Sequence, residues 1–513
     1  MKLQKRTVFF IGALIGVLCL AGCNKQEKEK GGASITSIEQ LNNPAYTIGV
    51  PEGGAGMDMA KKYLPEAEHK TFSGNSSGYL AISQGKLDGF VYDRVMMEFA
   101  IASGLEDVEL LPENLGESVD VAVGISPKSQ IDHLKDKVNQ FLAKERAEGT
   151  LDEMYERWVS RAEKTMPSIP VPQAPTCKLK VGTTGMVQPF SYYEGTTLTG
   201  YDVELIYRFA AWLNAELEIK IYDYDGIIAA AQAGDIDCIM ANLNATEERR
   251  RHIEFSDCVY PSVTAVMVRA EQKDSQAQGF FASLKDSFLS TFVVEERWRL
   301  IAQGLGVTIL ISVFSGFFGL CLGFFICMLR RVHYKPVQLI AAVFVRVIQG
   351  MPIVVFLMIL YYGIFGSVDI SEILAAVIGF SINFAAYSSE IMRAGIETVD
   401  QGQREAALAM GYTRRQTFFK IVFPQAATNF IPVLKGEFIS MVKMTSVVGY
   451  IAVQDLTKAS DIIRSRTMEA FFPLIVTALL YFVVANVMTT ALTFAESKAS
   501  PRRNRRSVKG VKI

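Results

Sequence analysis

Five long apolar stretches in the second half of the chain constrain its fold more than any other feature. They lie near residues 303–329, 337–364, 371–389, 427–451 and 471–492. Each is long enough to cross a hydrocarbon core of roughly 30 Å as a helix. The fourth is the least regular, because Lys435, Glu437 and Lys443 interrupt it. The sequence therefore predicts an all-α membrane domain over 301–495, with about five transmembrane helices, after a charge-rich first half.

Basic residues around these stretches indicate an orientation. They form three clusters, which are residues 330–335, the set Arg393, Arg404, Arg414, Arg415 and Lys420, and the tail at 496–513. Basic residues concentrate on the cytoplasmic side of membrane proteins. Five spans place all three clusters on one side, opposite the first half of the chain. We therefore expect a cytoplasmic C-terminal tail and an extracytoplasmic first half.

The N-terminal residues have the pattern of an export signal. A basic start is followed by an apolar run from Thr7 to Gly22 and then by Cys23. This order predicts a secretory signal over 1–23. The stretch Leu20-Ala21-Gly22-Cys23 also resembles a bacterial lipobox, after which Cys23 would be lipidated. The alternative is an uncleaved anchor helix. Both interpretations export the residues after position 23 and place the chain in a bacterial plasma (inner) membrane as a multi-pass protein.

Cysteine and charge statistics exclude several classes of protein. Seven cysteines are too few and too scattered for a disulfide framework. Cys238 and Cys258 either pair in an oxidising compartment or remain buried thiols. With only four histidines, no metal-binding spacing appears, and we expect no metal site. The formal net charge of -1 gives no indication of a nucleic-acid partner, and we expect none.

The segment between the third and fourth apolar stretches contains the most specific motif. It reads Glu405-Ala406-Ala407, then Gly411, and continues to Pro424. Small alanines let a short helix approach another surface, glycine permits a sharp turn, and proline opens the next element. Further motifs accompany it at 349–352, 387–396, 402–403, 424–426 and 443–446. Over roughly 290–495 the chain resembles the permeases of bacterial ABC importers for polar amino acids, whose EAA loop has this form.

This resemblance implies partners. In such permeases the EAA helix docks on a cytoplasmic ATPase, so Glu405, Ala406, Ala407 and Gly411 would couple ATP hydrolysis to the membrane helices. The chain contains no G-x-x-x-x-G-K-[ST] sequence. We therefore expect no cofactor and no enzymatic activity on this chain, with ATP bound by two copies of a separate ATPase subunit. The resemblance also implies a homodimer through the permease domain.

Glu390 is an ionisable residue in or beside the third apolar stretch. Such residues are costly in lipid unless they face a cavity or a partner. Two interpretations remain open, which are a position in the translocation path and an ion pair with Arg393 one turn on.

Residues 178–270 show the βαβ rhythm of a parallel sheet. Alternating strands are expected at 178–183 and 216–221, with a helix that opens at Gly200 between them. Three motifs come after them, at 234–237, 246–249 and 255–257. Together they resemble the first half of lobe 1 of periplasmic amino-acid-binding proteins, close to the glutamine- and histidine-binding type.

Residues 36–160 resemble lobe 2 of the same fold, followed by its closing helices. The matching features are the strand at 47–50, the glycine loop at 53–56, the motif at 85–93, the strand at 119–125 and Trp158. Because the two segments complete one domain in reversed order, we infer a circular permutation, with the usual ends joined by a proline-rich linker over 161–177. Residues 271–300 would lead to the membrane. The expected fold is an α/β two-lobed periplasmic-binding-protein fold, circularly permuted, followed by the all-α membrane domain.

The permutation predicts an altered hinge. We expect the new ends to fall at one of the two hinge crossovers, so that only the strand near 119–126 connects the lobes covalently, which would loosen the hinge. An alternative is a domain swap, in which 178–270 pairs with 36–160 of a neighbouring chain.

The resemblance assigns the ligand site by position. Arg249 would bind the ligand α-carboxylate, a task suited to a planar guanidinium, in a turn that begins at Thr246. Tyr224 would stack over the bound side chain and Asp93 would accept the ammonium. Backbone N–H groups of the loop at Gly53 and Gly54 would complete the carboxylate site.

The pocket departs from the glutamine-binding pattern. Thr184 stands where a carboxylate often lies, Val187 replaces an aromatic residue and Asn244 replaces a hydroxyl residue. The loss of the carboxylate weakens the case for a cationic ligand, so a polar uncharged or acidic amino acid is favoured.

The sequence therefore predicts the substrate-binding and permease subunit of an ATP-binding-cassette importer for a polar amino acid. The alternatives are a ligand-gated amino-acid receptor or channel without ATPase coupling, and a cell-wall lyase with this binding fold. The EAA loop argues against the first, and the absence of a recognisable catalytic constellation from the sequence argues against the second.

Overall fold

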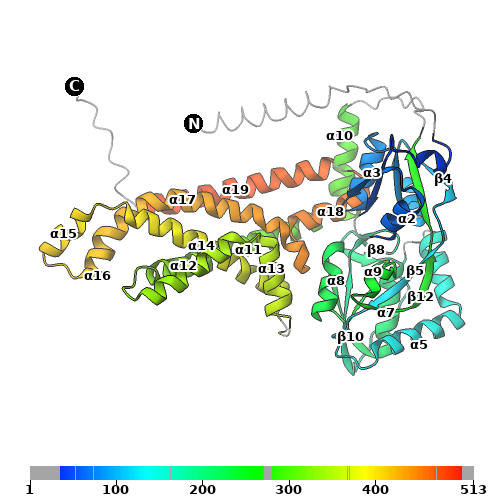
Figure 1. Ribbon diagram of the computed structural model, residues 1–513, viewed down its shortest axis with the longest axis horizontal. Coiled ribbons are helices and arrows are strands. Elements are labelled where there is room, and N and C mark those ends of the chain that lie inside the picture. Colours follow the sequence, from blue (N-terminus) through cyan, green and yellow to red (C-terminus); the bar gives the residue numbers. More distant parts are fainter. Residues whose placement is uncertain are drawn as a thin grey trace.

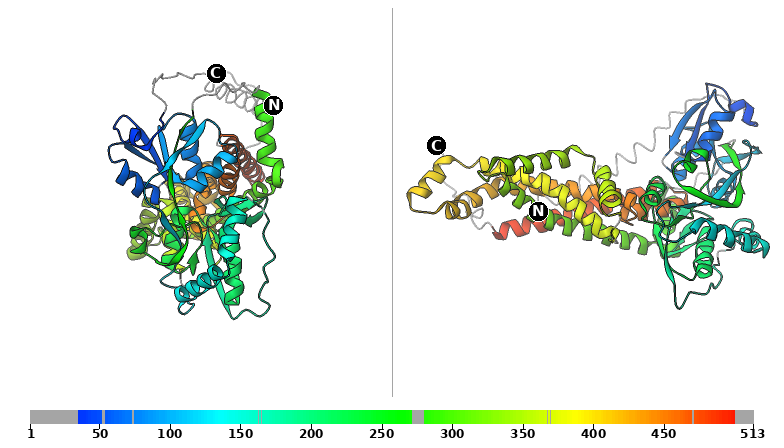
Figure 2. Two further views of the ribbon diagram at one scale, coloured as in Figure 1. Left: turned by 90° about the vertical axis from the view of Figure 1, so that its right-hand side faces the viewer. Right: turned by 60° about the horizontal axis from the view of Figure 1, so that its bottom comes forward.

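A computed structural model describes residues 35–51, 54–72, 74–161, 163, 165–270, 280–366, 368, 370–469 and 471–499. The expected signal peptide with Cys23, the loop residue Gly53 and most of the basic tail lie outside the described residues. Figure 1 shows an elongated molecule with a helical domain at one end and an α/β domain at the other. Figure 2 shows the same division from two further sides. This division agrees with the expected fold class.

The membrane domain contains three long apolar helices. They are α11 (Trp298–Leu329), α14 (Glu372–Glu397) and α19 (Phe471–Ala499). Two further helix pairs are sharply bent. They are α12 (Lys335–Gly350) with α13 and η5 (Ile353–Ile364), bent by 113°, and Arg414–Ile451 with α18 (Leu456–Thr467), bent by 60°. Within the described residues, three helices are long and apolar enough to cross a membrane, or up to five if each bent pair forms one span.

Glycine lets the first and third apolar stretches pack closely. Gly319 of α11 faces α14, and a Cβ atom there would lie 2.8 Å from the carbonyl oxygen of Ser381. Gly323 lies one turn further along α11, and a Cβ atom there would lie 3.0 Å from the carbonyl oxygen of Ala385 in α14. Small residues at helix interfaces allow this close backbone approach in membranes. The contact between α11 and α14 is therefore central to the membrane domain.

The α/β domain has two sheets, each with helices on its faces. The first, which we call lobe 2, has the order β2-β1-β3-β13-β4. Its strands are β1 (Thr47–Pro51), β2 (Glu68–Phe72), β3 (Gly89–Asp93), β4 (Val108–Asn114) and β13 (Thr264–Arg269). Its helices are α2 (Ala55–Tyr63), α3 (Asn75–Ser83) and α4 (Arg94–Ala102). Strands β1, β2 and β3 are parallel, while β13 is antiparallel to β3 and β4.

The second sheet, lobe 1, has the order β10-β6-β11-β5-β12. Its strands are β5 (Val119–Ile125), β6 (Cys177–Thr183), β10 (Ala215–Ile221), β11 (Cys238–Ile239) and β12 (Glu254–Ser262). Its helices are α5 (Leu134–Ala147), α6 (Thr150–Tyr155), α7 (Tyr201–Leu213), α8 (Tyr224–Ala233) and α9 (Glu247–Arg250). A small sheet of β7 (Met186–Val187), β8 (Ser191–Glu194) and β9 (Thr197–Thr199) adjoins it.

The expected single connection between the lobes is wrong. The chain crosses from lobe 2 to lobe 1 between β4 and β5, and returns at Val263 between β12 and β13. Residues 254–269 form two strands in two sheets, so the chain leaves the α/β domain from lobe 2 and not from the hinge. Both crossovers are therefore present, and the predicted loosening of the hinge has no support. Strand β13 also belongs to lobe 2, although it lies in the segment assigned to lobe 1.

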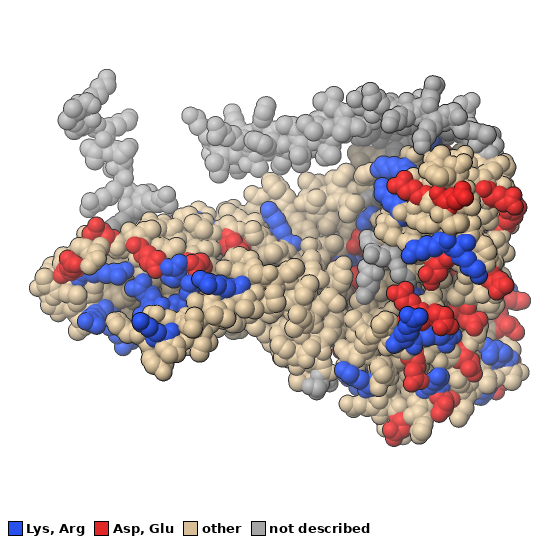
Figure 3. All heavy atoms as spheres, viewed as in Figure 1, with Lys and Arg blue, Asp and Glu red and all other residues tan. Residues whose placement is uncertain are grey.

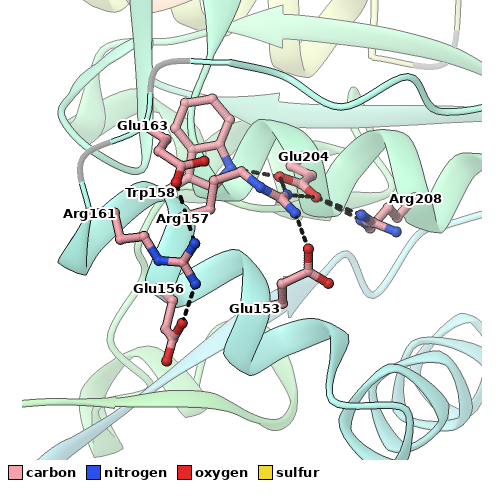
Figure 4. Close-up of polar contacts among 8 residues, drawn as sticks. All are labelled: Glu153, Glu156, Arg157, Trp158, Arg161, Glu163, Glu204 and Arg208. Carbon is pink, nitrogen blue, oxygen red and sulfur yellow. Dashed lines mark hydrogen bonds and ion pairs between the residues drawn. The ribbon is translucent and has the colours of Figure 1, made fainter.

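A buried carboxylate joins the two sequence segments. Glu204 of α7 is fully buried, and each of its carboxylate oxygens accepts a hydrogen bond from Arg157 Nη1 at 2.8 Å. Trp158 Nε1 donates to it at 2.6 Å, and Arg208 donates at 2.7 Å. Figure 4 shows these side chains converging on Glu204. The closing helices of the first segment are thereby fixed to the second segment by charge-assisted bonds.

Candidate ligand-binding cleft and its junction with the membrane domain

Arg249 is held in a fixed position in lobe 1. It lies in the short helix α9, whose N-cap Thr246 accepts a hydrogen bond from the Arg249 backbone N–H at 3.4 Å. The residue is 5% exposed. Its Nη1 donates to the Asn244 carbonyl oxygen at 3.0 Å, and its Nη2 donates to the Tyr224 hydroxyl at 2.9 Å. A buried guanidinium held in this way can bind a planar anionic group such as a carboxylate.

Tyr224 is the aromatic neighbour of this arginine. It is the first residue of α8, and the Arg249 guanidinium carbon lies 5.3 Å from the centroid of its ring. A cation over an aromatic face at this distance is attracted by the ring. The structure therefore brings together Arg249, Tyr224, Asn244 and Thr246, as the sequence predicted.

Tyr92 faces this group from lobe 2. Burial raises the pKa of its phenol well above the usual range, and the nearby charge of Arg249 opposes that increase. The Tyr92 hydroxyl accepts a hydrogen bond from Asn75 Nδ2 at 2.8 Å. The sequence interpretation missed both residues, and the available signal was the position of Tyr92 directly before Asp93. The two lobes therefore meet at the arginine–tyrosine cluster.

Asp93 lies beside the hinge and already has two donors. Its Oδ1 accepts from the Met96 backbone N–H at 3.3 Å and caps α4, and its Oδ2 accepts from the Ser262 hydroxyl. Burial raises the pKa of this carboxyl. The Ser262 contact spans the two lobes, because Ser262 ends β12 of lobe 1. Asp93 is thus a structural link at the hinge, whatever else it binds.

Two other expected positions have contrasting surroundings. Thr184 is 1% exposed, and its hydroxyl has no hydrogen-bond partner among the described residues. A buried hydroxyl without a partner is unfavourable, so a ligand group there would be stabilising. Gly54 is the N-cap of α2 in an extended conformation, and a Cβ atom on it would meet nothing within 4 Å. Backbone N–H groups at such a helix start can bind an anion.

The EAA motif forms a helical hairpin at the far end of the membrane domain. Helix α15 (Gln401–Ala409) carries Ala407 buried, with Glu405 and Ala406 exposed. Gly411 turns the chain with φ of +85°, a conformation that suits glycine. Helix α16 (Arg414–Thr417) follows with a capping box between Thr413 and Gln416. Figure 1 places α15 and α16 at the end opposite the α/β domain.

Charged side chains are unevenly distributed along the length of the molecule. Figure 3 shows lysine and arginine gathered around the α15–α16 end, a mostly uncharged middle, and mixed charges over the α/β domain. Glu390 lies at the α15–α16 end of α14 and forms ion pairs with Arg330 and Arg393. The ion-pair interpretation of Glu390 therefore has direct geometric support.

The helical domain has known relatives. Residues 316–499 match the family described as binding-protein-dependent transport system inner membrane component. The chain belongs to this family of inner-membrane transport components. Three Bacillus subtilis (strain 168) proteins are similar. Probable amino-acid ABC transporter permease protein YckA is 33% identical over 41% of this chain and 93% of that protein. Arginine transport system permease protein ArtQ is 35% identical, over 37% and 87%. L-cystine transport system permease protein TcyB is 32% identical, over 38% and 85%.

The family match covers the helical domain, which we now call the permease domain. It makes the protein a multi-pass component of the inner membrane, and the family is one of transport components, not of enzymes. The two-lobed α/β domain that carries Arg249 and Tyr224 is joined to this permease domain in a single chain.

Lobe 1 contacts the permease domain through buried charges. Lys220 of β10 is 7% exposed, and its Nζ lies 2.7 Å from Asp235 Oδ1 and 2.8 Å from Glu372 Oε1 at the start of α14. The Tyr361 hydroxyl lies 3.0 Å from both oxygens of Asp235. A buried charge is costly unless it is paired in this way.

A second polar contact joins lobe 1 to α18. Lys458 of α18 is 3% exposed, and its Nζ donates to Asp223 Oδ1 at 2.6 Å and to the Tyr222 carbonyl at 3.1 Å. Gln454 Nε2 donates to the Tyr193 hydroxyl at 2.8 Å. Lobe 1 is therefore anchored to the permease domain by several directional contacts, next to the start of the helix that carries Tyr224.

Proposed function

We propose that this chain is the combined receptor and permease of an ATP-binding-cassette importer for a polar amino acid. The observation that carries the proposal is Arg249, buried with Tyr224 in a two-lobed domain that is anchored on a permease domain. Three similar permeases carry names of amino-acid transporters. An arginine of this kind is suited to the carboxylate that every α-amino acid carries.

The ligand class is inferred from the groups around Arg249. The α-carboxylate would bind Arg249 and the N–H groups near Gly53 and Gly54, and Tyr224 would cover the side chain. The ligand ammonium would donate a third hydrogen bond to Asp93, in addition to those from Met96 and Ser262. An ionised carboxylate offers about four acceptor positions, so it can accept this bond. Thr184 and Asn244 favour a polar uncharged or acidic side chain. The names of the relatives include arginine and cystine, so they indicate the class and not the individual amino acid.

The α15–α16 hairpin is the proposed site of a separate ATPase. Its exposed surface includes Glu405, Ala406, Leu408 and Met410, of which Leu408 is 45% and Met410 is 68% exposed. Exposed apolar side chains beside a helix of small residues suit a protein partner. We propose that two ATPase copies bind a homodimer of this chain and that ATP binds only to the partner. This end would then be cytoplasmic and the α/β domain extracytoplasmic.

We further propose that the binding domain is circularly permuted. Lobe 1 and lobe 2 each contain strands from both segments, and neither segment is duplicated. The linker over 161–177 contains Pro167, Pro170, Pro172 and Pro175, which favour an extended chain of roughly 3 Å per residue. An export signal over 1–23, with lipidation at Cys23, would place the domain outside the membrane.

Glu390 has a simpler proposed role than transport. Its ion pairs to Arg330 after α11 and to Arg393 within α14 tie the ends of these two helices together. We propose that it is a structural tie at the cytoplasmic end, in place of a position in the translocation path.

Uptake by membrane vesicles tests the function directly. Inverted and right-side-out vesicles that contain the full chain and its ATPase would be supplied with each radiolabelled amino acid. We expect accumulation of at least one amino acid in right-side-out vesicles, only with internal ATP. Ligand-induced ion flux without ATP would instead indicate a receptor or channel.

A further inference from the structure

The outer end of α18 contacts both lobes of the α/β domain. The helix runs from Leu456 to Thr467 and ends at Met468, which has a positive φ of 52°. Its last residues, Ser465 and Met468, line a small cavity of about 20 Å³. The cavity walls also include Tyr79 and Ala100 of lobe 2 and Gln188 of lobe 1. A cavity of this size holds about one water molecule, so the three parts are closely packed.

The contact with lobe 1 is polar. Arg466 is 8% exposed, and its Nη1 donates to the Gln188 side chain while its Nη2 donates to Glu295 Oε1 at 2.9 Å. Its guanidinium carbon lies 4.7 Å from the centroid of the Tyr192 ring. Together with Lys220 and Lys458, Arg466 fixes lobe 1 on the permease domain through directional bonds.

The contact with lobe 2 is different in kind. Met468 packs against the apolar cluster of lobe 2 that includes Tyr79, Phe90 and Ala100. Between the described parts of lobe 2 and of the permease domain, no hydrogen bond or ion pair is present. A flexible apolar side chain on an apolar surface separates without leaving an unpaired buried polar group. Lobe 2 can therefore leave α18 at a smaller cost than lobe 1.

The difference between the lobe 1 contact and the lobe 2 contact matters when the two lobes move apart. The two lobes are joined by two short connections, so opening of the cleft carries lobe 2 away from a lobe 1 that stays anchored. Asn75 also lines the small cavity and donates to Tyr92, which faces Arg249 across the cleft. The position of lobe 2 at Met468 thus depends on the same closure that brings Tyr92 to Arg249.

We propose that residues 465–468 are the part of the permease domain that detects cleft closure, with Arg466 holding lobe 1 at all times and Met468 engaging lobe 2 only when the cleft is closed. Met468 is then a positioning residue, which couples occupancy of the cleft to the membrane helices through α18 and α17 (Phe423–Met444). This inference rests on the proposed function, because closure is ascribed to the bound amino acid.

Cysteine cross-linking in the full chain tests the two contacts separately. One variant carries Met468→Cys with Ala100→Cys, and the other carries Ser465→Cys with Met186→Cys, because Met186 lines the same cavity and leaves the Arg466–Gln188 contact intact. A short bifunctional thiol reagent is applied in membranes with and without each of the twenty amino acids. Cross-linked peptides are identified by mass spectrometry, which separates them from products of the native cysteines. We expect the lobe 1 cross-link to be constant and the lobe 2 cross-link to rise several-fold with an amino acid that binds.

Transport provides the second measurement. Met468→Ser should lower uptake roughly tenfold or more and weaken amino-acid binding by the full chain by up to a similar factor, because a half-buried apolar contact made only in the closed state is lost and closure is linked to binding. Val293→Ser, at an exposed apolar position in the segment before α11, is the matched control and should transport normally.

The outcomes separate the two proposals. If wild-type chain binds an amino acid but the lobe 2 cross-link does not respond, or Met468→Ser transports normally, the detector role is wrong and the transport function stands. If none of the twenty amino acids binds the wild-type chain, the proposed function fails and this inference fails with it.

Discussion

Lys220 in the α/β domain and Glu372 in the permease domain form an ion pair, with 2.8 Å between Nζ and Oε1. They are far apart in the sequence, and the pair is shared with Asp235, which lies 2.7 Å from the same nitrogen. Lys220 is a buried cation between two carboxylates of opposite domains. The receptor and the permease are therefore held together by side chains as well as by the chain itself.

Removal of the Glu372 charge should weaken this junction. Glu372→Gln leaves Lys220 with Asp235 and the more distant Glu218, both in its own domain. Loss of one partner of a buried charge pair costs about 2–5 kcal/mol in comparable interfaces. We expect uptake to fall at least tenfold, since each 1.4 kcal/mol corresponds to about a factor of ten. Amino-acid binding should not change. Glu296→Gln, at an exposed carboxylate before α11, is the control, and equal uptake by both variants would contradict the role of the ion pair.

Arg249 and Arg251 differ in burial although they are near neighbours. Arg249 is buried against Tyr224, whereas Arg251 is exposed. We expect Arg249→Ala to raise the dissociation constant for the amino acid by roughly 100-fold or more, because a buried charge partner worth about 2–5 kcal/mol is removed. Arg251→Ala should bind normally. Equilibrium dialysis of the full chain measures both, and similar affinities for the two variants would show that the carboxylate is bound elsewhere.

The buried carboxyl group of Asp202 should make the stability of lobe 1 depend on pH. Burial raises its pKa from 3.8 to about 7, while the Asn242 backbone N–H, at 2.7 Å, opposes the shift. The folded state therefore binds more protons than the unfolded state between about pH 4 and pH 7, so this contribution to stability is lost as the pH rises through that window.

Asp202→Asn should remove the part of the pH dependence of stability that Asp202 contributes. The amide oxygen still accepts the Asn242 bond and carries no charge at any pH. The difference in stability between this variant and wild type should therefore grow from pH 5 to pH 8, by roughly 2–4 kcal/mol at most. Thermal unfolding of the full chain at several pH values measures it. A constant difference would show that Asp202 is ionised throughout the range.

Glu405 tests the proposed ATPase site without affecting the fold. Its side chain is exposed and accepts one hydrogen bond, from Gln401 Nε2 at 2.9 Å. Glu405→Lys should abolish copurification of the ATPase and lower uptake at least tenfold, while amino-acid binding is retained. Gln401→Ala removes only the exposed hydrogen bond, worth about 1 kcal/mol or less, and should remain active. Normal copurification with Glu405→Lys would place the ATPase contact elsewhere.

Hydropathy predicted where the membrane helices lie but not their directions. The second apolar stretch bends by 113° around Met351 and Pro352, and the fourth turns by 60° before α18. Window averages measure composition, so they continue across a break whose residues are also apolar. The turn at Ala452, with φ of 62°, has no sequence signal, because alanine favours helix.

The residues of the candidate ligand site were only partly predictable, because some lie in local motifs and others meet only through long-range pairing. Arg249 and Tyr224 lie in local motifs, and the structure brings them together. Tyr92 and the β12–β13 crossover depend on pairing between distant strands. Residues 254–269 form two consecutive strands, and Pro261, which is compatible with a strand edge or end, is a local signal near the change of sheet but does not show that the two strands join different sheets. Such long-range pairing is set by the burial of both faces and not by the local pattern.

Calorimetric titration of the full-length chain with each of the twenty amino acids tests the central claim most directly. We predict saturable binding of at least one polar uncharged or acidic amino acid at one site per chain, and no heat of binding with Arg249→Ala. A wild-type chain that binds none of the twenty, or an Arg249→Ala variant that binds as tightly as wild type, would contradict it.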